Sequence, residues 1–386
     1  MAKGQTLEVG TKYLRRLNAS EITEQFDFFD FLQPVPFTPY ISTDSTTSFN
    51  NNQNILGAYT SYTANIKKWS LKAGLRYEHT WLNATFDTNI QNFELDYPSL
   101  TPSATATYRI TDMQSLKLGY NNRIQRPSIS FLNPYIDRRD PKFITYGNPN
   151  LDPEKSHNVS MTFSSFASKY NLNAELSYLF VNNGIEQFST LENGIQEITY
   201  GNIGKKNQLG LSVFGSYRGL KWLNLFTNAS VNYVNLESKA IQSVNSGLTG
   251  RMFLGGTITL PKDFRFSFGG GGNLPQLSLQ GSQSAFYFSY GALSKDFLKK
   301  KLNVSISGVY LPVSRIQITT EAKNTATGNL TFKQKTEVHL TSNTEFRLNM
   351  SYRIGNMNAQ VKKVKKSINI DDQKQKENTN IGETPM

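Results

Sequence analysis

Apolar and polar residues alternate with a period of two along most of the chain. The clearest case is the segment 69–81, where the odd positions include Trp69, Leu71, Leu75, Tyr77 and Trp81 and the even positions are mostly polar. Successive side chains of a β-strand point to opposite faces, so this pattern predicts a strand with one apolar face. An aromatic residue stands at each end of that face.

The same alternation recurs in at least seven further segments. Segments of about 9–11 residues are long enough to cross a membrane as tilted strands. We expect every apolar stripe to face lipid, and we count roughly fourteen strands, the first near 6–13 and the last ending near Ile354. The further stripes cover 116–120, 172–180, 209–217, 223–233, 286–292, 302–310 and 346–354.

Short and long links alternate between these segments. Such alternation is typical of outer-membrane barrels, which have short periplasmic turns and longer extracellular loops. We therefore predict an all-β, transmembrane, antiparallel up-and-down β-barrel, integral to the outer membrane, with about 14 strands in residues 1–355. The short links are 67–68, 111–113, 168–170, 218–220, 261–263 and the surroundings of Lys299; the long ones are 15–52, 83–98, 125–154, 183–204, 237–247 and 314–342.

Residues 356–386 differ from the rest of the chain. They lack aromatic residues and alternation and are rich in Lys, Asn, Gln, Asp and Glu. We expect a flexible polar periplasmic tail. At the other end, the opening residues MAKGQTLEVG carry no secretory leader, from which we expect a fragment, a mature chain or a shortened reading frame.

Composition removes several other classes of protein. The mean hydropathy is −0.45 and no run of 18 apolar residues occurs, so no membrane-spanning helix is predicted. Strands with alternating faces average to such a polar value. The absence of cysteine excludes disulfides, thiolate zinc sites and a cysteine nucleophile.

The net charge of +12 does not indicate a nucleic-acid-binding protein. Lys and Arg are scattered, with clusters only at 67–68, 299–301 and 362–366, and no basic helix or RNA-binding motif accompanies them. Anionic lipid head groups are the expected neighbours of these clusters.

The sequence nominates no catalytic residue, metal site or cofactor. His79, His157 and His339 are far apart and lack ligand spacing. The glycine run 269–272 is not followed by the Lys-Ser/Thr and helix of a phosphate-binding loop. An outer-membrane hydrolase stays open as an alternative, because catalytic triads are set by space rather than by spacing.

Aromatic residues at the ends of the stripes are candidates for the two interfacial girdles of a barrel. These candidates are Trp69, Tyr77, Trp81, Tyr120, Tyr178, Tyr217, Tyr233, Tyr310 and Tyr352.

One stretch of the sequence resembles a known family. Residues 147–156, GNPNLDPEKS, resemble the GNPxLxPE box in barrels of TonB-dependent receptors, and 74–78, 126–128 and 132–135 match the surrounding pattern in the same order. The match is nearest to the outer-membrane barrel family common in Bacteroidota. It implies the C-terminal portion of a barrel of about 22 strands.

The resemblance also implies a function. Such proteins are receptors and transporters for nutrients such as siderophores, glycans or peptides. Their partners are outer-membrane lipid and lipopolysaccharide, a plug domain, an inner-membrane energy-coupling protein and, in some cases, a surface lipoprotein. The alternative is a self-contained or truncated barrel that acts as an anchor or a passive pore.

The family motif falls in a proline-rich loop. One interpretation folds this loop into the barrel mouth, with Arg126, Asn133, Asn148 and Glu154 facing the plug or lining a substrate path. The other is that its residues only end and restart strands, since Pro and Asn are common in turns. The candidate residues are Arg126, Pro127, Asn133, Pro134, Gly147, Asn148, Pro149, Leu151, Pro153 and Glu154.

Overall fold

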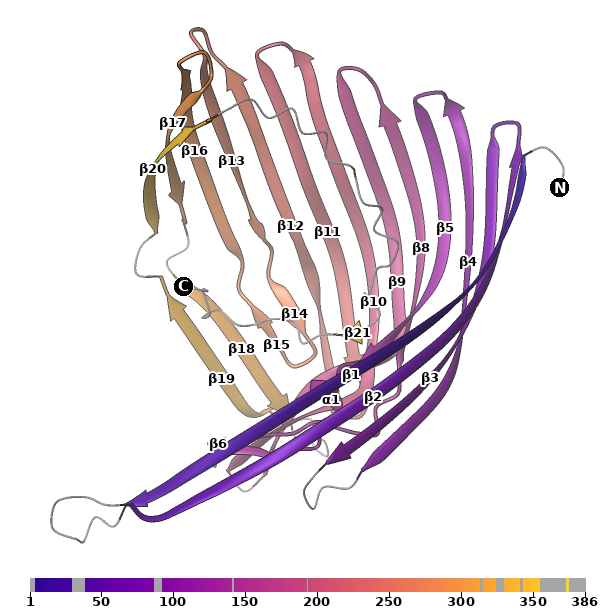
Figure 1. Ribbon diagram of the computed structural model, residues 1–386, viewed down its shortest axis with the longest axis vertical. Coiled ribbons are helices and arrows are strands. Elements are labelled where there is room, and N and C mark those ends of the chain that lie inside the picture. The colour runs from indigo at the N-terminus through magenta and orange to yellow at the C-terminus, as the bar shows by residue number, and fades with distance from the viewer. Residues whose placement is uncertain are drawn as a thin grey trace.

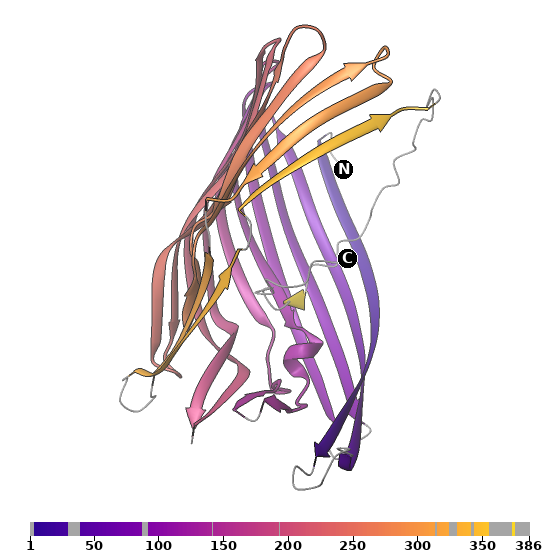
Figure 2. The ribbon, with the colours of Figure 1, turned by 90° about the vertical axis from the view of Figure 1, so that its left-hand side faces the viewer.

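A computed structural model describes residues 4–29, 39–86, 92–140, 142–192, 194–312, 315–323, 330–340, 343–354 and 373–374. Its main feature is one curved antiparallel sheet that encloses a hollow (Figures 1 and 2). The long strands are β1 (Gln5–Phe29), β2 (Pro39–Ile66), β3 (Trp69–Phe86), β4 (Phe93–Thr111), β5 (Gln114–Pro127), β8 (Glu154–Phe166), β9 (Tyr170–Glu192), β10 (Ile195–Leu220), β11 (Leu223–Ser238), β12 (Ser243–Thr259), β13 (Phe264–Asn273), β16 (Phe286–Phe297), β17 (Leu302–Tyr310) and β20 (Thr344–Tyr352).

These fourteen strands, counted within the described residues, form a meander in which each pairs with the next along the chain. The predicted all-β, up-and-down architecture and its strand number are confirmed. Within the described residues no pairing joins β1 to β20, so the sheet is open between these edges (Figure 1). Smaller elements connect some strands: α1 (Ile129–Leu132), β6 (Asp137–Asp140), β7 (Phe143–Thr145), β14 (Gln276–Ser278), β15 (Gly281–Gln283), β18 (Arg315–Lys323) and β19 (Leu330–His339).

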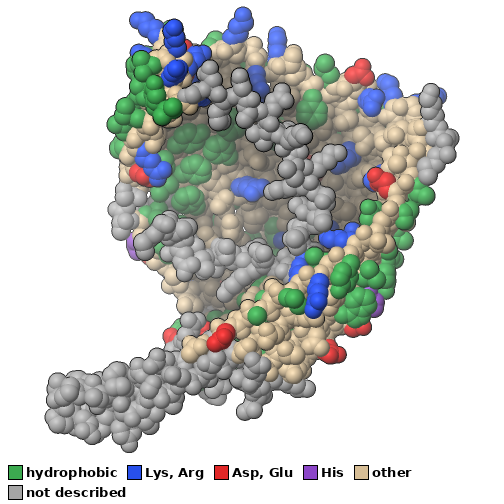
Figure 3. Space-filling model, viewed as in Figure 1, with side chains coloured by type: hydrophobic (Ala, Val, Ile, Leu, Met, Phe, Trp, Pro, Cys, Tyr) green, Lys and Arg blue, Asp and Glu red, His purple; other side chains and the backbone are tan. Residues whose placement is uncertain are grey.

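The predicted alternation sets the two faces of the sheet. In β3, Leu71, Leu75 and Tyr77 are 41%, 44% and 46% exposed on the convex outer face, whereas Glu78 and Thr80 of the opposite parity are buried. Cross-strand partners share a face, so the pairing registers extend this assignment to every other strand. We call the concave side the lumen face; Figure 3 shows this hollow, lined mainly by polar and backbone atoms with scattered Lys and Arg and some patches of hydrophobic side chains.

The stripe 286–292 is an exception, and its expected contact with lipid is wrong. The registers of β12, β13 and β16 put Tyr287 and Leu293 on the outer face with Leu254, so Phe288 and Tyr290 face the lumen. Both parities of β16 carry large apolar residues, so alternation alone could not choose between them. The lumen face accommodates these rings because Gly269 and other glycines lie opposite, and a Cβ on Gly269 would lie 2.6 Å from the Tyr290 ring.

The short links form tight turns at one rim of the sheet, as predicted. Most long links, however, continue as ladders: β9 and β10 pair from Tyr170↔Tyr217 up to Glu192↔Ile195, and β1 pairs with β2 to its end at Phe29. The alternation fades there because both faces of a hairpin beyond the membrane can be polar. The backbone still needs hydrogen-bond partners, and the ladder supplies them.

Two further predictions concern membrane spans and the tail. Among the described residues, no helix has both the length and the hydropathy of a membrane span. The predicted tail 356–386 lies outside the described residues except for β21 (Gln373–Lys374), which pairs in parallel with Arg126 and Pro127.

Candidate functional site: the mouth loop

The candidate site lies where two neighbouring strands separate. β4 and β5 pair only as far as Ser103↔Asn121, while β5 remains paired with β8 up to Gln125↔Glu154. Beyond this fork, Arg126 contacts the lumen side of β3, two strands away. The end of β5 therefore crosses the lumen face of β3 and β4 and carries the following loop inward. We call residues 128–153 the mouth loop.

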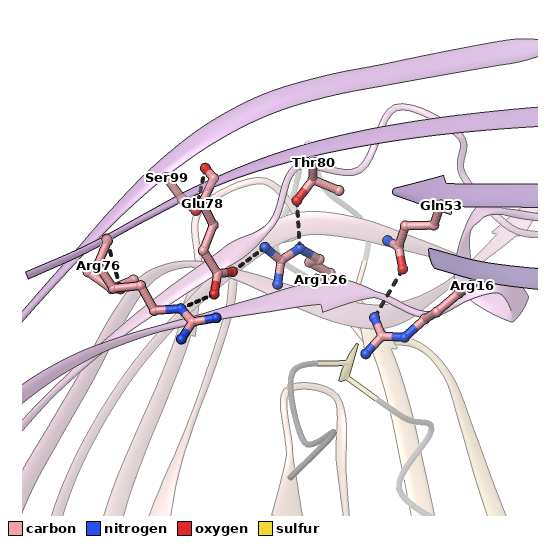
Figure 4. Close-up of polar contacts among 8 residues, drawn as sticks. Arg16, Gln53, Arg76, Glu78, Thr80, Ser99 and Arg126 are labelled. Atoms are coloured by element: carbon pink, nitrogen blue, oxygen red, sulfur yellow. Dashed lines mark hydrogen bonds and ion pairs between the residues drawn. The ribbon is translucent and has the colours of Figure 1, made fainter. Parts of the chain in front are cut away.

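Arg126 fixes this crossing through a buried ion pair. Its side chain is completely buried, and its Nη2 donates to Glu78 Oε2 at 2.5 Å (Figure 4). Its Nε donates to Thr80 Oγ1 at 2.9 Å, and Arg76 approaches the other Glu78 oxygen. Removing charges from water is costly unless they are paired and hydrogen-bonded, and all three groups meet that condition here.

An apolar cluster holds the mouth loop between two walls of the sheet. Phe131 and Leu132 of α1 and Leu151 are buried against the lumen side of the β2–β3 wall and against the β9–β10 wall. The ring of Phe131 stacks on that of Tyr200, with centroids 4.2 Å apart, and burial raises the pKa of the Tyr200 phenol. The wall residues in the cluster are Phe49, Leu82, Ala84, Phe86, Ile185 and Tyr200.

The family motif forms the return path of the loop. The amide of Gly147 donates to the Asn133 carbonyl at 2.8 Å, and that of Asn148 donates to the Phe131 carbonyl at 2.6 Å. A Cβ on Gly147 would overlap the Asn133 carbonyl oxygen, which explains why glycine occupies this close approach. The side chain of Asn148 donates to the Tyr200 carbonyl at 2.9 Å, which ties the motif to β10.

The end of the motif is tied to the same wall. The Asp152 amide donates to Asn202 Oδ1 at 2.8 Å, and Asn202 Nδ2 donates back to the Asp152 carbonyl at 2.9 Å. Glu154 is buried and accepts a hydrogen bond from the Ile185 amide at 3.1 Å. Leu151, which precedes Asp152, is buried in the apolar cluster.

The structure thus brings the predicted loop residues together at one place. Arg126, Leu151 and Glu154 are buried, and Asn133 and Asn148 are partly buried with bonds inside the loop or to the wall. The remaining candidates lie in the same segment: Gly147 and Pro127 are buried, and Pro134, Pro149 and Pro153 are partly buried along the loop.

Sequence reasoning did not single out the partners of these residues. Glu78 and Thr80 were recognised only as polar members of an alternating strand, and Tyr200 and Asn202 fell in a segment predicted to be a loop. The GLRYE match at 74–78 was the signal that could have pointed to Glu78.

A second inward contact lies beside the mouth loop. The Ser189 amide donates to Gln280 Oε1 at 2.8 Å, and Gln280 Nε2 donates to the Ser189 carbonyl at 3.2 Å. Leu279 is buried with Val234, Leu236 and Ile241. The β14–β15 hairpin therefore folds back onto the lumen side of the β9–β12 wall.

The interfacial candidates lie on the outer face. The rings of Trp69 and Tyr108 pack at a tilt at the short-turn rim, with centroids 4.8 Å apart, and Trp81 stacks on His79 at 4.2 Å toward the other end. Tyr120 is partly exposed; the other members, Tyr77, Tyr178, Tyr217, Tyr233, Tyr310 and Tyr352, are exposed. In the described part of the chain, no three His, Asp or Glu side chains come together as a metal site would require.

A family model gives the wider context of this geometry. The model of the outer membrane protein beta-barrel family matches residues 1–352. The chain belongs to this family. Its sheet is therefore the wall of an integral outer-membrane protein. No curated protein matches the sequence.

Solved receptors and transporters of the outer membrane share the family's fold with this chain. The copper transporter OprC aligns with a TM-score of 0.59 and 13% identity, over 91% of this chain and 55% of its own. The ferric yersiniabactin uptake receptor FyuA from Yersinia pestis gives 0.57 and 14%, and the ferric citrate transporter FecA gives 0.56 and 14%, each over 91% of this chain and 52% of its own. The chain thus spans about half the length of these proteins.

Proposed function

We propose that this chain is the barrel portion of a TonB-dependent receptor-type transporter that takes up a nutrient across the outer membrane. Its partners would be a plug domain, an inner-membrane energy-coupling protein and a surface lipoprotein. A siderophore, a glycan or a peptide would be its cargo, and no step of enzyme chemistry belongs to the proposal.

The mouth loop is the observation that carries this proposal. It spans the lumen between the β2–β3 and β9–β10 walls and is held by a fully buried arginine and an apolar cluster. An open channel for passive diffusion would not need a packed, ion-paired segment across its mouth. A receptor needs a structured surface at the mouth that binds its ligand, and a passage that stays closed until transport takes place.

The fold of the solved neighbours supports the same class. These neighbours are receptors and transporters for ferric siderophores, ferric citrate and copper. At 11–14% identity they support the architecture of this chain rather than any particular cargo.

Energy dependence separates this proposal from an anchor or a passive pore. Cells with and without the gene are compared for growth on single sources of chelated iron, oligosaccharide and peptide, and uptake of the affected compound is measured with and without a protonophore. We expect a defect on one class of compound and uptake that stops when the proton gradient is dissipated. Uptake of many small solutes that ignores the protonophore would instead establish a passive pore.

The mouth loop gives a second arm to the test. An Asn202→Ala variant removes both hydrogen bonds to Asp152 while leaving the strand pairing of β9 and β10 in place. We expect reduced uptake of the same compound at unchanged protein level in the membrane. Normal uptake in this variant would show that the loop is not part of the transport path.

A further inference from the structure

We propose that the outer face of the barrel holds an anionic phospholipid at a built site over β2, β3, β4 and β5. The site has two parts: an apolar groove for an acyl chain, and a cationic turn below it for the head group. The proposal does not depend on the transport function.

The groove is formed by small residues between large ones. On the outer face, Ala73 and Ala104 are opposite each other, and the same row continues to Tyr62 on one side and Tyr120 on the other. In the next row toward the short-turn rim, Ala106 lies between Leu71 and Leu118. The resulting depression has a volume of about 660 Å³ and is lined almost entirely by carbon.

The head-group part lies at the rim next to this groove. Trp69 and Tyr108 pack at a tilt at the edge of the apolar band, a position that aromatic side chains prefer in membranes. Directly beyond them Lys67 and Lys68 are exposed, and Lys68 Nζ donates to the Ile110 carbonyl of the neighbouring strand β4 at 3.2 Å. Two cations of the turn thus lie near the rim side of the groove, where the polar end of a lipid would lie.

The backbone of the turn is in an unusual conformation at Lys67. Its φ is 51°, in the left-handed region that glycine or asparagine adopts most readily. Lys262, Lys299 and Lys300 have the same conformation in other short turns, so cationic turns recur along this rim. The neighbouring apolar groove is therefore what distinguishes the turn at Lys67 as a lipid site.

The occupant follows from position and charge. Short turns mark the periplasmic rim of a barrel, so the two lysines lie at the level of the head groups of the periplasmic leaflet. A phosphodiester with a net negative charge, such as phosphatidylglycerol, gains from each cation, while a zwitterionic head group gains less. We therefore assign the site to an anionic phospholipid.

Trp69 gives a local readout of lipid contact. The 386 residues contain three tryptophans, so Trp81→Phe and Trp222→Phe leave Trp69 as the only one. This protein is inserted into vesicles of phosphatidylethanolamine and phosphatidylglycerol in which one lipid or the other carries bromine on its acyl chains. We expect brominated phosphatidylglycerol to quench Trp69 with about tenfold preference over brominated phosphatidylethanolamine.

Two pairs of variants test the two parts of the site. In the single-tryptophan protein, Lys67→Gln with Lys68→Gln should abolish the preference, whereas Lys299→Gln with Lys300→Gln, which removes the same charge from another left-handed turn, should leave it unchanged. Ala104→Leu should fill the groove and at least halve the preference, whereas Ala229→Leu, on the outer face of β11, should not.

Several results would overturn the assignment. These are equal quenching by the two lipids, a preference that survives the Lys67 and Lys68 changes, an equal loss in the Lys299 and Lys300 control, and no effect of Ala104→Leu. Lys67→Arg with Lys68→Arg keeps the charge and should restore the preference, which separates loss of the site from misfolding.

Discussion

Arg126 is the residue on which the position of the mouth loop most depends. Replacing it by Met leaves Glu78 buried with only Arg76 as a cationic partner. Loss of one member of a buried pair typically costs about 3 kcal/mol or more. We expect Arg126→Met to lower the free energy of unfolding by about 3 kcal/mol, measured by guanidinium unfolding in lipid vesicles.

The exposed pair Arg347–Glu345 provides the control. Both side chains are more than half exposed, so Arg347→Met should change stability by less than about 1 kcal/mol. Combining Arg126→Met with Glu78→Leu should recover much of the loss, because no fully buried charge is then left unpaired and the Arg76 side chain, 33% exposed, reaches water. Equal costs for Arg126→Met and Arg347→Met would contradict the role given to the buried pair.

Adjacent residues of β16 test which face meets lipid. Leu293 lies on the outer face and Ala292 on the lumen face, at nearly the same depth. Arginine on the lipid face costs about 2–4 kcal/mol near the bilayer centre, and much less on the lumen face. We expect Leu293→Arg to destabilise the folded protein by at least about 2 kcal/mol more than Ala292→Arg. The opposite order would reverse the faces of β16.

At the scale of single elements, the mouth loop depends on one close approach of its backbone. A Cβ at Gly147 would lie 2.6 Å from the Phe131 carbonyl oxygen, so Gly147→Ala should displace the loop from the wall. Gly194→Ala is the control: its added Cβ would contact no other atom, and the substitution would strain only the local turn, where φ is +79°. Limited proteolysis should cut residues 128–153 in the first variant much faster than in the second.

Hydrogen exchange tests the extended hairpins. Residues 183–204 were predicted to be a link, whereas β9 and β10 stay paired across them. We expect the backbone amides of the paired positions 186–190 and 197–201 to exchange at least about 100-fold more slowly than an unstructured chain. Exchange at the rate of a free loop would restore the original interpretation of this segment.

For the whole molecule, the sequence was sufficient to predict the class, strand number and short turns. In 69–81 every second side chain meets lipid and must be apolar, so the strand is visible as an alternation in the sequence. In 183–204 no lipid contact requires apolar side chains, so the strand pairing continues although the sequence does not alternate. In β16 both faces are apolar, so the choice of face depended on Gly255, Gly269 and Gly271 of neighbouring strands.

The candidate site was predictable only in part, because its contacts join residues that are distant in sequence. The motif 147–154 located the loop, but its partners Glu78, Tyr200 and Asn202 are distant in sequence. Only the fork between β4 and β5 brings them together. A pairing that stops at Ser103↔Asn121 leaves no trace in the alternation of either strand.

The membrane assignment also predicts how the whole protein migrates. A barrel resists detergent until heated, since the backbone hydrogen bonds between its paired strands are protected from water. We expect unheated protein in dodecyl sulfate to run at a lower apparent mass than boiled protein. Identical migration, together with release from membranes by carbonate alone, would contradict the integral placement.

The length of the strands has a consequence at the cell surface. β10 has 26 residues, which at about 3.3 Å per residue amounts to roughly 86 Å, more than twice the length that a strand tilted by about 35–45° needs to cross an apolar layer of about 25 Å. Much of β9 and β10 therefore stands outside the bilayer as rigid ladder. An antibody or a phage reaching the cell would meet a stiff wall of β-structure there. Because successive side chains of a strand point to opposite faces, every second side chain on that wall points outward and can change without altering the interior.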